Sequence, residues 1–144
     1  MGFKIRPASR KDLSACTKIF LREFNRIGEN WTRETARPRL ASSLENFPKL
    51  FFCLELDGKV IGLLCGKPFW GDEGKSLYLN DFAITSQKQE KGFGLKALRF
   101  IEKLAKKQGF NSLFLDTNQK KKAIKIYKKF GFKKTDYVIM NKKL

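Results

Sequence analysis

The residues whose types and spacing most clearly suggest chemistry lie in the stretch QKQEKGFGLKALRF, residues 87–100. Gly92 and Gly94 stand one residue apart, directly before apolar residues at helical spacing. The backbone N–H groups of such a turn, together with the positive end of the following helix, can bind a pyrophosphate. Gln89 and Lys91 would add side-chain donors. The pattern Q-x-x-G-x-G therefore predicts an anion-binding loop.

A nucleotide triphosphate loop is one alternative, because residues 71–76 read GDEGKS. That motif requires a glycine at the position of Phe69, and it must open a helix. Residues 71–76 precede an apolar run that is typical of a strand, so the pattern disfavours this alternative.

A dinucleotide-binding fold is a closer alternative. Gly92, Gly94 and Ala97 spell G-x-G-x-x-A at a helix start, and Asp116 ends the next expected strand about 20 residues later. That fingerprint begins in the turn directly after a strand, whereas the seven residues TSQKQEK separate Ile84 from Gly92. Too few residues would also remain for the other βαβ units.

A second group of polar and aromatic residues follows in LFLDTNQKKKAIKIYKKFGF, residues 113–132. Asn118 follows an expected strand, and Ala123 and Tyr127 share a helix face at i and i+4. Gly131 then ends that helix. The result is the pattern strand-Asn-x8-Tyr-x3-Gly-Phe.

The elements that must position these residues follow from apolar periodicity and from turn residues. Asp57 and Gly58 favour a tight turn between two strands. Ser9 and Pro38 each favour the start of a helix. Residues 66–75 are expected to form a glycine-rich loop. The expected strands are 3–6, 50–56, 59–65, a central strand at 76–84, 112–116 and 137–141, and the expected helices are 9–24, 38–47, 93–108 and 120–130.

The two motifs, in this order and at this spacing, resemble those of the GNAT superfamily of acyl-coenzyme A dependent N-acyltransferases. The resemblance covers residues 76–132, and the expected hairpin and helices before them suit that fold. It implies an α/β (α+β) fold with a mixed, mostly antiparallel central sheet, flanked by helices and splayed between its central strands. Residues 1–144 would form a single N-acetyltransferase domain.

The resemblance also implies transfer of an acetyl group from acetyl-CoA to a primary amine by direct attack within a ternary complex. The end of the expected strand 76–84 would form hydrogen bonds with the pantetheine, and the glycine loop would bind the pyrophosphate. Asn118 of the second motif would bond the cofactor arm. Lys91 and Lys128 are candidates for the 3′-phosphate. The implied cofactor-binding residues are Phe82, Ala83, Ile84, Gln89, Glu90, Lys91, Gly92, Phe93, Gly94, Leu95, Asn118 and Tyr127.

Two side chains are implied to be catalytic. Tyr127 would protonate the leaving thiolate as a general acid, and the N–H of Ile84 would support the thioester carbonyl. Because the chain has no histidine, a carboxylate or a chain of water molecules would have to take the proton of the amine. The resemblance implies Asp81 as the candidate base, since relatives often have a glutamate at this strand position. Alternatively, Asp81 only orders hydrogen bonds beside Asn80, and Tyr127 is an aromatic residue of the core.

Two positions depart from the common family pattern. Gln89 stands where many members have arginine, which removes one charged contact to phosphate. Ser86 replaces a common proline.

The charge distribution leaves other functions open. The chain carries 31 Lys and Arg against 14 Asp and Glu, a formal charge of +17. Residues 87–144 hold 17 basic and 4 acidic side chains, which favours an anionic partner. A basic nucleic-acid-binding domain and a non-catalytic CoA-binding member of the same fold are therefore the alternatives to an enzyme.

The acceptor is expected to bind near residues 24–44 and 67–75, where Trp31, Phe69 and Trp70 are candidates for the pocket. Both small-molecule and protein amines remain open. Three widely spaced cysteines without histidine predict buried thiols and no metal site. No run approaches the roughly 18 apolar residues of a membrane helix, so we expect no membrane partner, a cytoplasmic location and a monomer or homodimer.

Overall fold

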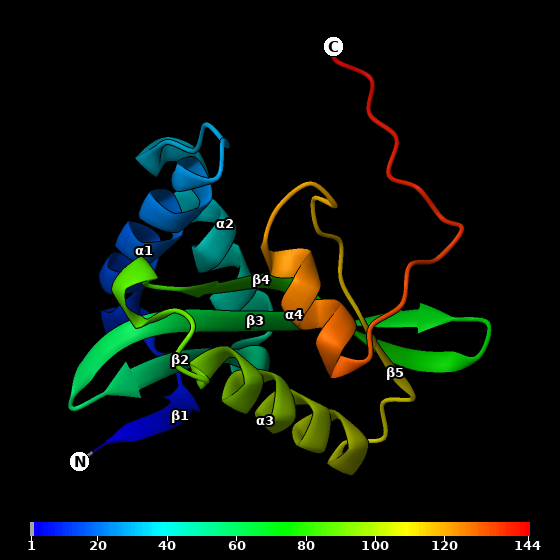
Figure 1. The fold of residues 1–144 in the computed structure, drawn as a ribbon, viewed down its shortest axis with the longest axis horizontal. Coiled ribbons are helices and arrows are strands. Elements are labelled where there is room, and N and C mark those ends of the chain that lie inside the picture. The colour runs from blue at the N-terminus through cyan, green and yellow to red at the C-terminus, as the bar shows by residue number, and fades with distance from the viewer. Residues whose placement is uncertain (1) are drawn as a thin grey trace.

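The computed structural model describes residues 2–144, which form one sheet with helices on both faces (Figure 1). The strands lie in the order β1-β2-β3-β4-β5. Neighbouring strands are antiparallel, except that β4 and β5 are parallel. The strands are β1 (Phe3–Pro7), β2 (Phe51–Leu56), β3 (Lys59–Gly71), β4 (Gly74–Ile84) and β5 (Ser112–Phe114). This mixed, mostly antiparallel sheet confirms the predicted fold class.

Two α-helices cover each face of the sheet. In Figure 1, α3 and α4 lie in front of the sheet, and α1 and α2 lie behind it. Among residues 2–144, no helix is both long enough and apolar enough to cross a membrane. The α-helices are α1 (Leu13–Arg26), α2 (Arg33–Asn46), α3 (Phe93–Lys107) and α4 (Ala123–Phe130), and the 3-10 turns are η1 (Arg10–Asp12), η2 (Pro48–Leu50) and η3 (Ser86–Lys88).

The core consists of two apolar clusters, one on each face of the sheet. Successive side chains of a strand point to opposite faces. Leu63 therefore packs with the residues of α1 and α2, whereas Leu64 packs with those of α3. Cys16, Cys53 and Cys65 are free and fully buried, which confirms the predicted buried thiols.

The sheet opens between β4 and β5. The two strands pair only where residues 76–78 meet residues 112–114, because β5 ends at Phe114. Within the described part of the chain, residues 79–84 of β4 therefore have no partner strand on that side. The predicted splay is present at this point, directly before the glycine loop.

One extra residue, Asn80, interrupts the pairing of β4 with β3. Asn80 Nδ2 donates a hydrogen bond to Ser43 Oγ of α2 at 3.2 Å, and the next residue, Asp81, bonds Arg39 of the same helix. Such a bulge allows two consecutive side chains to face the same side instead of alternating. The bulge therefore directs both polar groups towards α2.

The predicted hairpin is confirmed at its turn but is longer than predicted. Asp57 and Gly58 have positive φ angles of 50° and 81°, as a tight hairpin turn requires. The prediction of a loop at 66–75 is wrong, because β3 continues to Gly71 and β4 begins at Gly74. Glycine residues made this region look irregular, but Gly66 lies at the register shift within the ladder, and Gly71 and Gly74 are paired at its end.

The second helix begins earlier than predicted. It starts at Arg33 rather than at Pro38, which lies inside it. Thr32 and Thr35 form a reciprocal cap, in which the Thr32 N–H donates to Thr35 Oγ1 at 3.0 Å. The third helical position holds a threonine, where this kind of cap usually has Glu or Gln, so the sequence pattern did not reveal the cap.

The predicted closing strand at 137–141 is wrong. Residues 132–144 contain no helix or strand and extend away from the sheet (Figure 1). Tyr137 is 92% exposed and Met140 is 87% exposed. The alternating apolar residues favour a strand, but a strand also needs a partner, and this segment pairs with no described strand. β5 and α4 are also shorter than predicted.

Candidate functional site

The last part of the loop that leads into α3, together with the start of the helix, has unpaired backbone donors. Within the described residues, no backbone N–H from Glu90 to Leu95 donates a hydrogen bond to another protein group. Glu90 and Gly92 have positive φ angles of 61° and 84°, which turn the loop tightly. The loop adjoins the N-terminal end of the 15-residue α3, where the helix dipole is positive. This arrangement fits a pyrophosphate.

Gly94 allows this loop to lie close to β4 and α4. A Cβ at Gly94 would lie 3.0 Å from Ile126 Cδ1, 3.8 Å from Ile84 Cδ1 and 4.0 Å from the ring of Phe82. A larger residue would therefore displace the side chain of Ile126. The missing side chain brings the anion-binding loop next to the open part of β4.

The backbone of β4 is available on its open side. Thr85 N donates to Ile61 O of β3 at 2.7 Å. Because peptide groups alternate in direction along a strand, those of Phe82 and Ile84 face the gap, and that of Ala83 faces β3. Two of the three predicted pantetheine-binding residues thus present backbone groups to the gap.

The side chain of Gln89 bonds protein groups at the start of the loop. Its Nε2 donates to Ile84 O at 2.7 Å and to Glu23 Oε1 at 3.4 Å. The amide is therefore directed towards β4 and α1. Its contact with a phosphate stays a prediction.

Glu23 is a polar residue of this site that the sequence analysis missed. It lies on α1, is 6% exposed, and accepts a hydrogen bond from Ser86 N at 3.1 Å. The sequence contains one signal for it. Glu23 follows Phe20 by three residues and Cys16 by seven, so it occupies the apolar face of an amphipathic helix.

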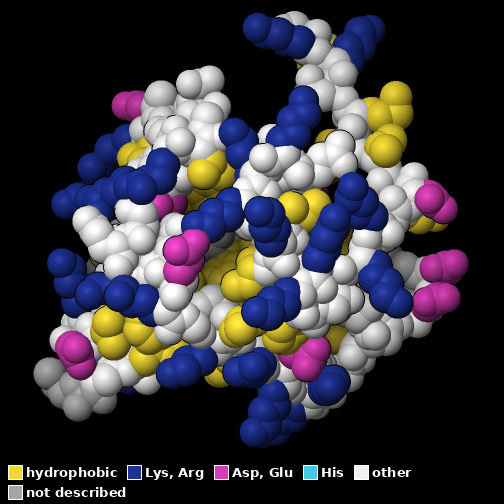
Figure 2. Space-filling model, in the orientation of Figure 1, with side chains coloured by type: hydrophobic (Ala, Val, Ile, Leu, Met, Phe, Trp, Pro, Cys, Tyr) yellow, Lys and Arg dark blue, Asp and Glu magenta, His cyan; other side chains and the backbone are white. Residues whose placement is uncertain are grey.

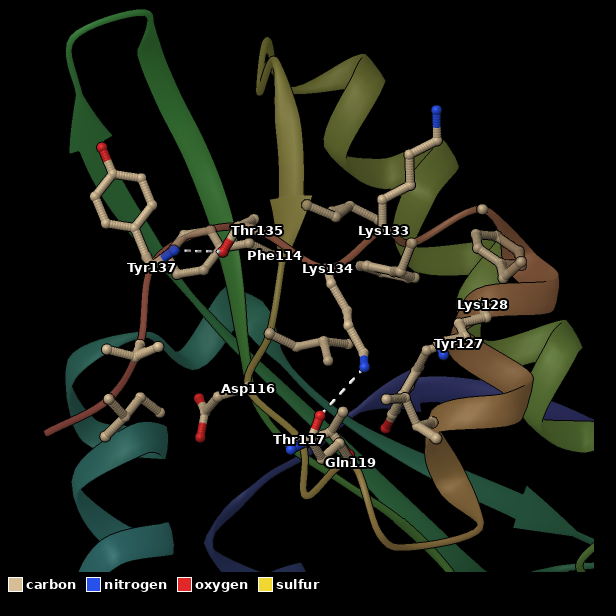
Figure 3. Close-up of a pocket in the computed structure, with 18 of the residues that line it drawn as sticks. Phe114, Asp116, Thr117, Gln119, Tyr127, Lys128, Lys133, Lys134, Thr135 and Tyr137 are labelled. Carbon is tan, nitrogen blue, oxygen red and sulfur yellow. Dashed lines mark hydrogen bonds between the residues drawn. The ribbon is translucent and has the colours of Figure 1, made fainter.

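Tyr127 stands on α4 above the open part of β4. Its ring centroid lies 6.5 Å from that of Phe82 and 5.8 Å from that of Phe132. Burial raises the pKa of its phenol to about 12. The residue also lines a cavity of about 770 Å³ between α4, β5 and the C-terminal segment, in which Figure 3 shows it near Thr117 and Gln119. This cavity does not include the glycine loop.

Asp81 is buried on the other face of β4, towards α2. It is 4% exposed, and Arg39 Nε donates to its Oδ1 at 3.1 Å and its Oδ2 at 3.0 Å. Burial raises the pKa of the Asp81 carboxyl, and the Arg39 guanidinium opposes that shift. Arg39 in turn lies 5.2 Å from the ring centroid of Trp31. The candidate base therefore belongs to an ion pair that is packed under an aromatic ring.

A second carboxylate lies on the same side of the sheet as Asp81. The Tyr78 hydroxyl donates a hydrogen bond to Asp116, just beyond the end of β5. Burial, and then the contact with Asp116, raise the pKa of Tyr78 to about 12. The sequence analysis considered Asp116 only for a dinucleotide site and did not identify Tyr78. The structure joins them across the pairing of β4 with β5, which no local pattern indicates.

Asn118 occupies the turn before α4. Its Oδ1 accepts a hydrogen bond from Lys120 N at 2.9 Å, so the side chain stabilises the turn that places α4. The side chain of Lys122, at the start of α4, forms an ion pair with Glu90 of the glycine loop. Lys91 and Lys128 are exposed. Figure 2 shows Lys and Arg side chains distributed over this face.

Comparison with known families identifies the fold. The model of the acetyltransferase (GNAT) family matches residues 13–132. The chain belongs to the acetyltransferase (GNAT) family. This GNAT chain is 26% identical over 119 residues to a Xenopus tropicalis protein named "Probable N-acetyltransferase camello", and 30% identical over 86 residues to a Xenopus laevis protein of the same name. The alignments cover 82% and 59% of the chain, but only 54% and 39% of those relatives.

Solved structures share the GNAT fold over almost the whole chain. A possible acetyltransferase from Clostridium difficile 630 superposes with a TM-score of 0.85 at 16% identity, covering 100% of this chain and 99% of the other. A predicted acetyltransferase from Clostridium acetobutylicum, solved with acetyl-CoA, has a TM-score of 0.78 at 18% identity, covering 96% of both chains. An aminoglycoside acetyltransferase from an uncultured soil metagenomic sample, solved with sisomicin, has a TM-score of 0.74 at 17% identity, covering 99% of this chain and 95% of the other.

Proposed function

We propose that this chain is an N-acetyltransferase that transfers an acetyl group from acetyl-CoA to a primary amine. One observation carries the proposal: the unpaired N–H groups of residues 90–95 lie next to an unpaired strand edge at 79–84. The first feature suits a pyrophosphate, and the second suits an extended chain of amides that bonds as an added strand. Membership of the GNAT family supports the same cofactor.

The general acid of the reaction would come from α4. When bound, acetyl-CoA supplies the acetyl group as a thioester. The N–H of Ile84 faces the gap and would donate a hydrogen bond to the thioester carbonyl oxygen. The Tyr127 phenol, with a pKa of about 12, keeps its proton at neutral pH and would donate it from Oη to the departing sulfur.

The proton of the amine would be removed on the face of β4 that packs against α2. Asp81 directly precedes Phe82, which contacts Tyr127, and adjacent strand residues point to opposite faces. The base and the acid therefore flank β4 from two sides. The amine would approach from α2, lose a proton to Asp81 and form a bond from its nitrogen to the thioester carbonyl carbon. The bond from that carbon to sulfur would then break, and the sulfur would leave as a thiol on the side of α4 with the proton from Tyr127. A raised carboxyl pKa makes Asp81 a stronger base.

The acceptor surface contains both charge signs. Arg39 and the buried Asp81 neutralise each other. Within the part of the chain that the structure describes, the exposed carboxylate of Asp116 accepts a hydrogen bond only from the Tyr78 hydroxyl. A carboxylate at this position would attract the ammonium form of an acceptor. The sisomicin complex of a structural neighbour supports amine acceptors for this fold. Small-molecule and protein amines both fit this chemistry.

Two measurements test the proposed function. Isothermal titration should detect saturable binding of acetyl-CoA. A free-thiol assay with a panel of small amines and peptides should then detect thiol release that depends on the amine. No saturable binding at high micromolar acetyl-CoA would overturn the proposal.

One observation favours a second candidate, a cofactor-binding protein without catalysis. Both oxygens of the Asp81 carboxylate accept hydrogen bonds from Arg39, and these bonds compete with an amine for the candidate base. Tight acetyl-CoA binding without thiol release, on any amine and at any pH between about 5 and about 10, would support this second candidate.

A further inference from the structure

The carboxylate of Glu23 is buried on the apolar face of α1, which offers it no hydrogen-bond donor. Its neighbours there are the apolar residues of α1, such as Phe20. Among residues 2–144, its one basic contact is Arg26 Nε at 3.7 Å, on a side chain that is 55% exposed. A buried carboxylate is costly unless hydrogen bonds satisfy it. The bonds that satisfy Glu23 come from outside α1.

Those bonds come from the segment that joins β4 to the glycine loop. Ser86 N donates to Glu23 Oε2 at 3.1 Å, and Gln89 Nε2 donates to Glu23 Oε1 at 3.4 Å. The same Gln89 amide donates to Ile84 O at 2.7 Å. One carboxylate therefore holds both ends of the 86–89 turn, and Gln89 ties that turn to the last residue of β4.

Electrostatics alone would disfavour a negative charge at this place. The unpaired N–H groups of the loop begin at Glu90, the residue that follows Gln89. A carboxylate near a pyrophosphate site repels the ligand. Its presence is explained if its hydrogen bonds fix the conformation of the loop, because a preformed loop loses less conformational freedom when a ligand binds.

We propose that Glu23 is a positioning residue for the pyrophosphate-binding loop and that it acts through Ser86 N and Gln89. The inference rests on the proposed function, because it assumes that the loop binds the pyrophosphate of a coenzyme A. It also gives Gln89 a second role: its side chain orients the loop, and the backbone beyond it holds the anion.

The variants Glu23→Ala, Glu23→Gln and Gln89→Ala test the inference by titration with CoA. Glu23→Ala should weaken CoA binding by about tenfold, because both hydrogen bonds are lost. Glu23→Gln keeps an oxygen that can accept from Ser86 N and should weaken it less. The loss of CoA affinity in the double variant Glu23→Ala/Gln89→Ala should be smaller than the sum of the two single losses, because the two residues share one link. Glu45→Ala, an exposed acid on α2, is the matched control and should bind normally.

A second readout separates positioning from general stability. Acetyl-pantetheine has no pyrophosphate, so its kcat/KM should stay within about twofold of wild type in Glu23→Ala, while the KM for acetyl-CoA rises and kcat is unchanged. Equal losses with both substrates would overturn the inference and leave the proposed function intact. CoA binding at wild-type strength in all variants would also overturn it.

Two further outcomes are informative. If Glu23→Ala fails to fold, Ser86→Pro replaces it. This change removes the donor N–H, together with the serine hydroxyl, at a half-exposed position and should weaken CoA binding by about threefold. Normal binding by Ser86→Pro would then count against the inference. If the wild-type chain itself does not bind CoA, the proposed function fails and the inference fails with it.

Discussion

At the scale of single residues, burial shifts the pKa of both candidate catalytic groups upwards, but the consequence differs for an acid and for a base. It raises the pKa of Tyr127 to about 12 and also raises the pKa of Asp81. For the phenol, the shift keeps the proton in place for donation. For the carboxyl group, it increases the affinity for a proton, and Arg39 limits the shift. Both shifts agree with the proposed roles of Tyr127 as the acid and Asp81 as the base.

The role of Tyr127 predicts the behaviour of Tyr127→Phe. The change removes only the hydroxyl group, so acetyl-CoA binding measured by titration should stay within about twofold of wild type. The kcat for thiol release should fall by about a hundredfold, the usual contribution of a general acid. Phe130→Leu, a conservative change on the same helix, is the control. An unchanged kcat in Tyr127→Phe would exclude the proposed proton transfer.

The ion pair of Asp81 predicts a pH dependence. Because the folded pKa of Asp81 is raised above its ordinary value of 3.8, activity should fall with acid at a pH above that value. Arg39→Gln removes the positive charge that opposes the shift, so the acid limb of kcat/KM should move to higher pH. Arg39→Lys should restore most of the wild-type profile, and Arg33→Gln should not change it. If the pH profile of kcat/KM in Arg39→Gln is identical to that of the wild type, Asp81 is not the base that titrates.

At the scale of elements, β4 organises the site. Its pairing with β5 ends at Tyr78, the bulge at Asn80 redirects the next side chain, and its last residues border the gap. The loop that follows approaches closely because Gly94 has no side chain. The candidate base Asp81 and the proposed anion-binding loop are thus placed by one strand and its connection to α3, whereas α4 carries the candidate acid Tyr127.

The backbone of the glycine loop predicts different outcomes for two matched glycine variants. Gly92 and Gly58 have φ angles of 84° and 81°, and an added Cβ at either position would meet nothing within 4 Å. Alanine should therefore destabilise the fold by about 1 kcal/mol in each case, as urea unfolding would measure. Only Gly92→Ala should also weaken CoA binding. Equal CoA affinity in the two variants would contradict the role of the loop.

A cluster of charges joins three elements at the other edge of the sheet. Arg6 of β1 bonds Asp12 through both carboxylate oxygens, at 2.9 Å each, and Glu55 of β2 at 2.6 Å. The hydrogen bond from Arg6 is the main reason that the pKa of Asp12 is lowered to about 2.

This cluster predicts how the free energy of unfolding depends on pH. The folded pKa of Asp12 lies below its ordinary value of 3.8, so its contribution is complete above that value and is lost as the pH falls towards 2. Urea unfolding should show a loss of about 1–2 kcal/mol from this group over that range. Asp12→Asn should be less stable at neutral pH and should lack that part of the pH dependence. An unchanged pH dependence would contradict the assignment.

At the scale of the whole molecule, the charge of +17 exceeds what one cofactor requires. Phe114 and Phe132 of the basic C-terminal part pack against other rings, so they do not form an exposed surface for bases, although Tyr137 in the same part is exposed. The charge therefore supports attraction of anions in general more than recognition of nucleic acid.

The positive electrostatic field of this net charge predicts that cofactor binding depends on the salt concentration. Raising NaCl from about 0.05 M to about 0.5 M should weaken CoA binding severalfold, because the cofactor carries several negative charges and screening shortens the range of the field. Binding of uncharged pantetheine, the control, should be nearly independent of salt. A gel shift with random duplex DNA that acetyl-CoA does not compete would instead favour a nucleic-acid-binding function.

Sequence by itself determined the elements whose signals are local. The hairpin at Asp57-Gly58, the amphipathic helix α3 and the anion-binding pattern at 89–94 all follow from residue types within a few positions of one another. Paired motifs also identified the family, because their order and spacing are encoded along the chain. Local signals failed where an unusual cap starts α2 and where the apolar segment at 137–141 pairs with no strand.

Only the tertiary structure decided which distant polar groups meet. The contact of Glu23 with Gln89 spans 66 residues, and that of Arg39 with Asp81 spans 42. Such pairs depend on how α1 and α2 pack against β4, and packing of this kind leaves no periodic signal in the sequence. Burial then sets the proton affinities of Asp81 and Tyr127, because the loss of water contact exists only in the folded chain.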